Sequence, residues 1–147
     1  MQTLLVTLLS SFLVFTNAGW ETDFSKAKQS AQSEHKLILL NFSGSDWCGP
    51  CIRMHKEIFE DNSFKEYAGD HLVLVNADFP RLKKHQLSKD QQAKNDQLAD
   101  RFNQDGIFPE TLLLTSDGKI LKEWKGFTPM TSEEFTKQVK AAADGNK

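Results

Sequence analysis

The chain contains two cysteines, Cys48 and Cys51, whose spacing suits the formation and breakage of a disulfide bond. They follow an apolar run at 37–42 and precede a segment with helical spacing, which predicts a strand, a turn and the start of a helix. Free backbone N–H groups and the positive end of the helix dipole favour a thiolate at a helix start, so Cys48 is the expected nucleophile.

Cys51 lies one helical turn beyond Cys48 on the same face, which makes it the expected resolving thiol. The two Cα atoms then fall within the roughly 4.4–6.8 Å that a disulfide spans. Gly49 leaves the attacking sulfur uncrowded, and Pro50 falls in the first helical turn, where a missing N–H group costs nothing. These four residues therefore predict thiol–disulfide exchange.

Two other roles for the cysteines compete with this chemistry. A purely structural disulfide is poorly placed here, since closing so small a ring stabilises the fold by only about 2 kcal/mol. A structural zinc site needs four ligands, and the four histidines are scattered along the chain: His35, His55, His71 and His85. Because His55 follows Cys51 by four residues, a metal carried by Cys48, Cys51 and His55 is the remaining metal hypothesis.

The stretch 47–51, Trp-Cys-Gly-Pro-Cys, matches the thioredoxin active-site pentapeptide in full, and over about 21–143 the chain resembles the thioredoxin superfamily. The string 42–48, Phe-Ser-Gly-Ser-Asp-Trp-Cys, is more similar to secreted thioredoxin-like proteins of bacteria. The resemblance implies an α/β thioredoxin fold, in which helices flank a central mixed β-sheet. It also implies a redox-active Cys48–Cys51 disulfide with no metal and no organic cofactor, and Trp47 as a shield beside the thiolate.

Pro109 stands where the thioredoxin fold has a cis-proline facing the dithiol, so the resemblance implies a cis bond at this position. Such a bond exposes the backbone of Phe108, where an extended substrate can pair by strand addition and bring its disulfide to Cys48. Phe108 also adds an apolar lip to this substrate site. An ordinary trans proline at the start of a strand is the alternative.

The sequence departs from thioredoxin behind the resolving cysteine. Thioredoxin has an aspartate paired with a lysine there, whereas this chain has Asn41 and Leu74 at the corresponding places. Asparagine does not exchange a proton in the working pH range, so the proton of Cys51 must leave by another route. Water is the simplest acceptor, and Glu110, next to Pro109, is a candidate carboxylate helper, with an exposed strand residue as the competing interpretation.

The elements that position these residues are predicted in the order helix, strand, helix, strand, helix, hairpin, helix. The runs 37–42 and 72–77 lack polar alternation, which is typical of strands covered on both faces, and 37–42 is the expected central strand. Asp117-Gly118 predicts a hairpin between strands at 107–114 and 120–125. Helices are predicted at 23–34, from 48, after 61–63, at 89–102 and from 131, the last two opening with the capping boxes Ser88/Gln91 and Thr131/Glu134.

The segment 81–95 is polar and rich in lysine, and it is longer than the usual connection at this place in thioredoxin-like proteins. We interpret it as an insertion whose charges form a solvated face. The alternative is a surface for docking a partner, which would depend on Arg81, Lys83 and Lys84.

Length and charge limit the other possibilities. A chain of 147 residues is expected to form one domain, and its formal net charge of −2 provides no basic field for nucleic acid. Residues 1–18 carry no charged side chain and read as a signal peptide ending in Thr16-Asn17-Ala18, which leaves 19–147 as the thioredoxin-like domain. About a dozen apolar residues fall short of the roughly 20 of a membrane anchor.

We therefore predict a periplasmic thiol–disulfide oxidoreductase that acts as a monomer. The favoured net direction is the reduction of disulfides in protein substrates. Gly49-Pro50 matches the reducing members of the resembled superfamily. A reductase outside the cytosol needs electrons from across the membrane, so we expect a membrane thiol relay as its donor. A disulfide oxidase or isomerase, a thiol-based metal carrier and a redox-inert scaffold are the alternatives.

Overall fold

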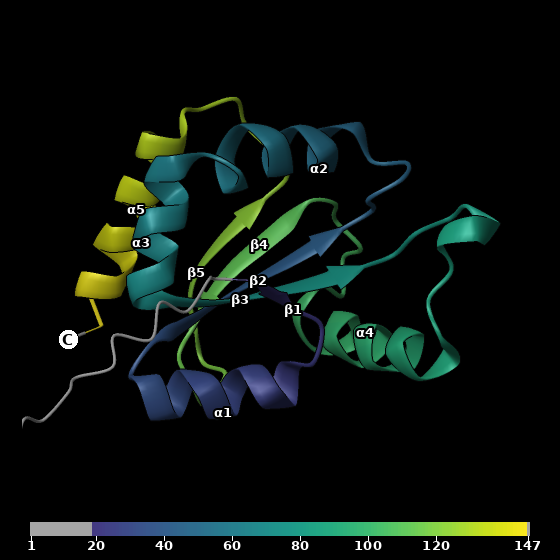
Figure 1. Cartoon of the computed structure of the whole chain (residues 1–147), viewed down its shortest axis with the longest axis horizontal. Helices are drawn as coiled ribbons and strands as arrows, with labels where there is room; N and C mark the ends of the chain where they lie inside the picture. Colours follow the sequence, from purple (N-terminus) through teal and green to yellow (C-terminus); the bar gives the residue numbers. More distant parts are fainter. Residues whose placement is uncertain (1–18, 147) are drawn as a thin grey trace, which may run out of the picture.

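The computed structural model describes residues 19–146, and a five-stranded sheet of order β1-β3-β2-β4-β5 runs through its centre (Figure 1). Its strands are β1 (Trp20–Glu21), β2 (Leu37–Ser43), β3 (Leu72–Asp78), β4 (Glu110–Leu114) and β5 (Ile120–Lys125). The helices are α1 (Phe24–Glu34), α2 (Gly49–Met54), α3 (Asn62–His71), α4 (Lys89–Phe102) and α5 (Ser132–Asp144). The predicted signal peptide, residues 1–18, lies outside the described residues.

The sheet is mixed, as predicted. β2 pairs in parallel with β3 and antiparallel with β4, so it is the central strand. β5 returns antiparallel to β4, which confirms the hairpin, and β1 adds a parallel edge beside β3. The sequence analysis missed β1 because a two-residue strand carries no periodicity.

Side chains of β2 and β4 alternate between two apolar cores, because successive residues of a strand point to opposite faces. Phe42 and Leu112 belong to the core beneath α1 and α4, whereas Leu39 and Leu113 belong to the core beneath α3 and α5. In Figure 1, α1 and α4 cover one face of the sheet, and α2, α3 and α5 cover the other. Coverage on both faces explains why the strand sequences show no polar alternation.

Caps fix the helix boundaries. α4 begins and ends where predicted, and the Ser88 hydroxyl accepts a hydrogen bond from the Gln91 N–H at 3.2 Å. The capping box predicted there is only half formed, because the Gln91 side chain donates to the Thr22 carbonyl and to Asn95 instead. The box of Thr131 and Glu134 at the start of α5 is complete.

Two boundaries differ from the prediction. The helix from the cysteines is not continuous, since α2 passes into one turn of π-helix, His55–Phe59, before α3 starts beyond its cap, Asp61. The strand predicted at 107–114 begins only at Glu110. The preceding segment leads into β4 through the Phe108–Pro109 peptide bond, which is cis.

Candidate active site

The dithiol lies at the start of α2, where β2 delivers the chain through a tight turn at 44–47. Cys48 is the N-cap residue, and its sulfur accepts a hydrogen bond from the Cys51 N–H at 3.2 Å. The two sulfurs form a disulfide, with the Cα atoms 5.2 Å apart. A backbone N–H aimed at Cys48 Sγ stabilises negative charge on that sulfur once the disulfide opens.

The dithiol is largely buried. Cys48 is 4% exposed and Cys51 is 5% exposed, so both sulfurs are largely covered by the protein. Gly49 and Pro50 are exposed, and a methyl group added at Gly49 would meet no atom within 4 Å. The first turn of α2 therefore leaves open space next to Cys48.

Trp47 is half-buried beside the cysteines. Its indole Nε1 donates to the Phe79 carbonyl at 2.7 Å, and its ring packs edge-on against Phe108 with centroids 5.5 Å apart. A methyl group at Gly44 would overlap the indole, so the turn needs glycine at that position. Because Phe108 touches Trp47, the cis-proline segment lies beside the dithiol turn.

A pocket of about 360 Å³ opens behind Cys51. Cys51 lines it together with Asn41, Ser43, Asn76 and the residues Ser45, Ile52, His55, Lys56 and Glu60. Asn41 is 5% exposed, donates to Asn76 Oδ1 at 3.2 Å and accepts from Thr111 Oγ1 at 3.0 Å. A neutral amide thus occupies the place behind the resolving cysteine, and the pocket is large enough to admit water there.

Glu110 is buried, which excludes the interpretation of an exposed strand residue. It is 1% exposed, and its Oε2 atom has no hydrogen-bond partner. Burial, together with the neighbouring Glu123 carboxylate, raises the pKa of Glu110 to about 7. Strand alternation directs its side chain to the face opposite that of Thr111, which contacts Asn41 and Met54. Its role as a proton helper stays a prediction.

His55 lies in the π-helical turn and faces other partners than the cysteines. Its Nε2 is 3.5 Å from Glu60 Oε1, and its ring lies 6.2 Å from that of Trp20. Within residues 19–146, no group of three or more His, Cys, Asp or Glu side chains is arranged to hold a metal ion. The structure therefore does not bring Cys48, Cys51 and His55 together as a metal site.

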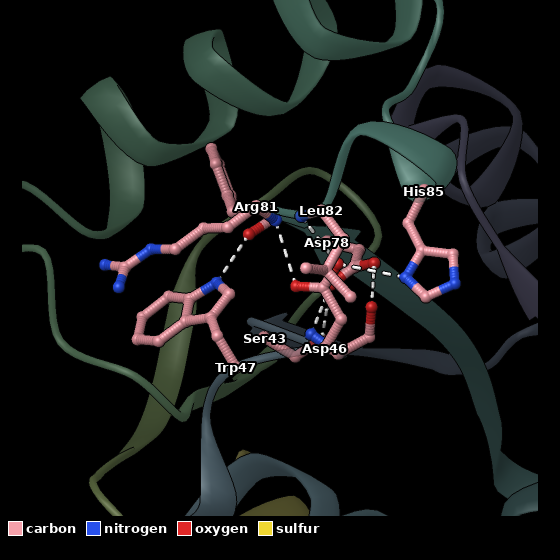
Figure 2. A network of polar contacts seen from close by, with 9 residues as sticks. Ser43, Asp46, Trp47, Asp78, Arg81, Leu82 and His85 are labelled. Carbon is pink, nitrogen blue, oxygen red and sulfur yellow. Dashed lines mark hydrogen bonds and ion pairs between the residues drawn. The ribbon is translucent and has the colours of Figure 1, made fainter.

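The sequence analysis missed two aspartates that fasten the start of the insertion to the active-site turn (Figure 2). The Asp46 carboxylate accepts hydrogen bonds from the N–H groups of Arg81 at 2.9 Å and Leu82 at 3.0 Å. Asp78 accepts from the Ser45 N–H at 2.8 Å and from the Ser43 hydroxyl at 3.2 Å. Partners more than 30 residues apart leave no local pattern, so sequence reasoning had no signal for these bonds.

The fold and the dithiol define a thioredoxin-like protein. A family model described as a thioredoxin-like domain matches residues 24–143, and the chain accordingly belongs to the thioredoxin-like family. This confirms the predicted superfamily and fold. Proteins with this oxidoreductase fold exchange disulfides through a redox-active Cys-x-x-Cys pair without an external cofactor, and here that pair is Cys48 and Cys51.

The chain is also similar to individual proteins of known sequence or structure. Disulfide bond reductase DsbH of Chlamydia pneumoniae is 38% identical over 126 residues, which cover 86% of this chain and 73% of the relative. The solved structure of a DsbH oxidoreductase is 33% identical, covers 93% of this chain and 92% of its own, and superimposes with a TM-score of 0.77. A thioredoxin from Thermus thermophilus, 16% identical over 87% of this chain and 88% of its own, has a TM-score of 0.59 and shares the fold.

Proposed function

We propose that this protein is a thiol–disulfide oxidoreductase that reduces disulfides in protein substrates. The observation that carries the proposal is the position of Cys48 at the cap of α2, with the Cys51 N–H directed at its sulfur. A thiolate at this place attacks a substrate disulfide, the substrate S–S bond breaks, and one substrate thiolate leaves as a Cys48 mixed disulfide forms.

Cys51 completes the cycle. Its thiol loses a proton, its sulfur attacks Cys48 Sγ, and the second substrate thiolate leaves as the Cys48–Cys51 disulfide forms. Two electrons pass from the dithiol to the substrate. Because Asn41 cannot accept the proton, we assign that step to water in the pocket that Cys51 lines.

We assign substrate positioning to the residues around the dithiol. An extended substrate segment pairs with the backbone of Phe108, and Pro109 holds that backbone beside the turn that carries Trp47. Gly49 and Pro50 keep the approach to Cys48 open. Phe108 supplies an apolar contact for the residues that flank the substrate cysteine.

The direction and the compartment rest on the relatives and on the sequence. The similarity to a disulfide bond reductase supports reduction as the net direction. We propose that 1–18 directs export and is removed, that 19–147 acts as a monomer in the periplasm, and that a membrane thiol relay returns electrons to Cys48 and Cys51. Among residues 19–146, no helix has the length and apolar character needed to cross a membrane.

Turnover with a protein disulfide tests the proposal. The reduced protein is expected to reduce insulin disulfides, and Cys48→Ser is expected to abolish this activity. Cys51→Ser retains the attacking thiolate, so it is expected to accumulate a mixed disulfide with the substrate, detectable by mass spectrometry. Insulin that stays intact with the wild type, or a mixed disulfide that forms equally well in Cys48→Ser, would contradict the assignment.

A further inference from the structure

The segment Arg81–His85, here called the cationic loop, is a basic, exposed stretch beside the active-site turn. It contains Arg81, Lys83 and Lys84 and no carboxylate, although the chain as a whole has a net charge of −2. All five of its residues are exposed, and Leu82 is 47% exposed. A local positive field on an otherwise acidic protein can steer a negatively charged partner to this edge.

The cationic loop is held in place at the active site. Asp46, two residues before Cys48, accepts hydrogen bonds from two of its backbone N–H groups and lies 3.0 Å from His85 Nδ1. The Asp46 side chain is only 5% exposed, so its charge faces the loop and not the solvent. The start of the insertion is therefore held against the active-site turn.

The Arg81 guanidinium lies over the Trp47 ring of the active-site turn. Its central carbon is 3.6 Å from the centroid of the Trp47 ring, a cation–π contact that Figure 2 shows beside the hydrogen-bond network. Within residues 19–146, no carboxylate pairs with this guanidinium. Its N–H donors are therefore available for the two-point contact that arginine makes with a carboxylate.

We propose that Arg81, assisted by Lys83 and Lys84, is a carboxylate-binding site that selects protein disulfides flanked by aspartate or glutamate. This inference rests on the proposed reductase function and adds the class of substrate. Trp47 joins the cationic loop to Cys48, so a carboxylate held by Arg81 belongs to a residue near the attacked cysteine. Leu82 offers an apolar contact on the same side.

This selectivity is tested with matched peptide disulfides, which the reduced protein is given as substrates. Peptides of equal length carry aspartate, serine or lysine on both sides of each cysteine, and kcat/KM is measured for each at low and at high salt. We expect the wild type to prefer the aspartate peptide over the lysine peptide by about fivefold to tenfold at low salt. The preference is expected to shrink as salt rises, because screening weakens exposed charge pairs.

Variants separate charge from geometry. Arg81→Gln is expected to bring the preference close to unity, and Arg81→Lys, which keeps the charge but loses the planar fork, is expected to restore only part of it. The double variant Lys83→Gln/Lys84→Gln leaves the Trp47 stack in place and is expected to lower the preference partially. The matched control is Arg101→Gln, an exposed arginine 4.6 Å from the Phe102 ring near the hairpin turn, which is expected to keep the preference.

The outcomes distinguish the two proposals. A wild type that reduces the aspartate and lysine peptides equally well overturns the carboxylate site and leaves the reductase function standing. A preference that survives in both Arg81→Gln and the double lysine variant also overturns it. A wild type that reduces neither the peptides nor insulin overturns both proposals.

Discussion

At the scale of single residues, the burial of Glu110 makes the stability of the fold depend on pH. Its pKa of about 7 lies above the ordinary value because burial disfavours the charged form, and Glu123 adds repulsion while Lys125 offsets part of it. A carboxyl whose pKa is raised in the folded state stabilises the fold below its unfolded pKa and loses that contribution as pH rises through its folded pKa. Unfolding therefore becomes easier between about pH 5 and about pH 8.5.

We predict that the wild type loses about 2 kcal/mol of unfolding free energy over this range, allowing for screening by solvent. Glu110→Gln is expected to flatten the dependence, as measured by denaturant unfolding at each pH. Glu123→Gln, on the exposed side of the pair, is the control and is expected to keep most of the pH dependence of the unfolding free energy. A Glu110→Gln protein with the slope of the wild type would contradict the account, and an unshifted pH profile of thiol exchange would remove the proton-helper role.

Asn41 gives a second prediction at this scale. Asn41→Asp places an ionisable group against Asn76 Oδ1 and Thr111, behind Cys51. We expect an additional ionisation in the pH profile of the resolving step, together with a loss of about 1–3 kcal/mol in stability, because a buried acceptor would face another acceptor. Single-turnover kinetics from about pH 6 to about pH 9 measures the first effect. A profile that coincides with that of the wild type would show that the pocket does not control the proton of Cys51.

At the scale of elements, the turn between β2 and α2 depends on Gly44. Gly44→Ala is expected to push the Trp47 indole out of place, breaking its bond to the Phe79 carbonyl and its stack with Arg81. Overpacking of this kind typically costs about 1–3 kcal/mol. Thermal unfolding measures the loss, and the aspartate-over-lysine peptide preference is expected to fall with it.

Gly69→Ala is the matched control for this prediction. A methyl group at Gly69, inside α3, would meet no neighbour within 4 Å. Alanine is the better helix former by about 0.5–1 kcal/mol, so this variant is expected to be slightly more stable than the wild type. If Gly44→Ala were as stable as Gly69→Ala, the packing assigned to the turn would be wrong.

At the scale of the whole molecule, local signals determined most of the fold. Ser88 and Thr131 marked the starts of α4 and α5, and the apolar runs marked β2 and β3. The dithiol was readable because two cysteines and a helix start are contiguous in sequence. The two-residue β1 and the π-helical turn carry no comparable pattern.

Long-range contacts were beyond prediction from the sequence. Asp46 meets the backbone of Arg81 across 35 residues, and Arg81 itself stacks on Trp47, yet Asp46 and Arg81 look like ordinary polar surface residues in the sequence. Glu110 is buried because β4 lies between β2 and β5 in a sheet covered on both faces. The contact between Arg81 and Trp47 and the burial of Glu110 both depend on the folded structure. Both alter the chemistry expected around the dithiol.

The central claim is that Cys48, at the start of α2, is an activated thiolate while Cys51 is its partner. Alkylation of the reduced protein with iodoacetamide at about pH 7, followed by mass spectrometry, tests it most directly. We predict that Cys48 is modified well before Cys51 and faster than the thiol of free cysteine. Modification of Cys48 at or below the rate of free cysteine would contradict the account.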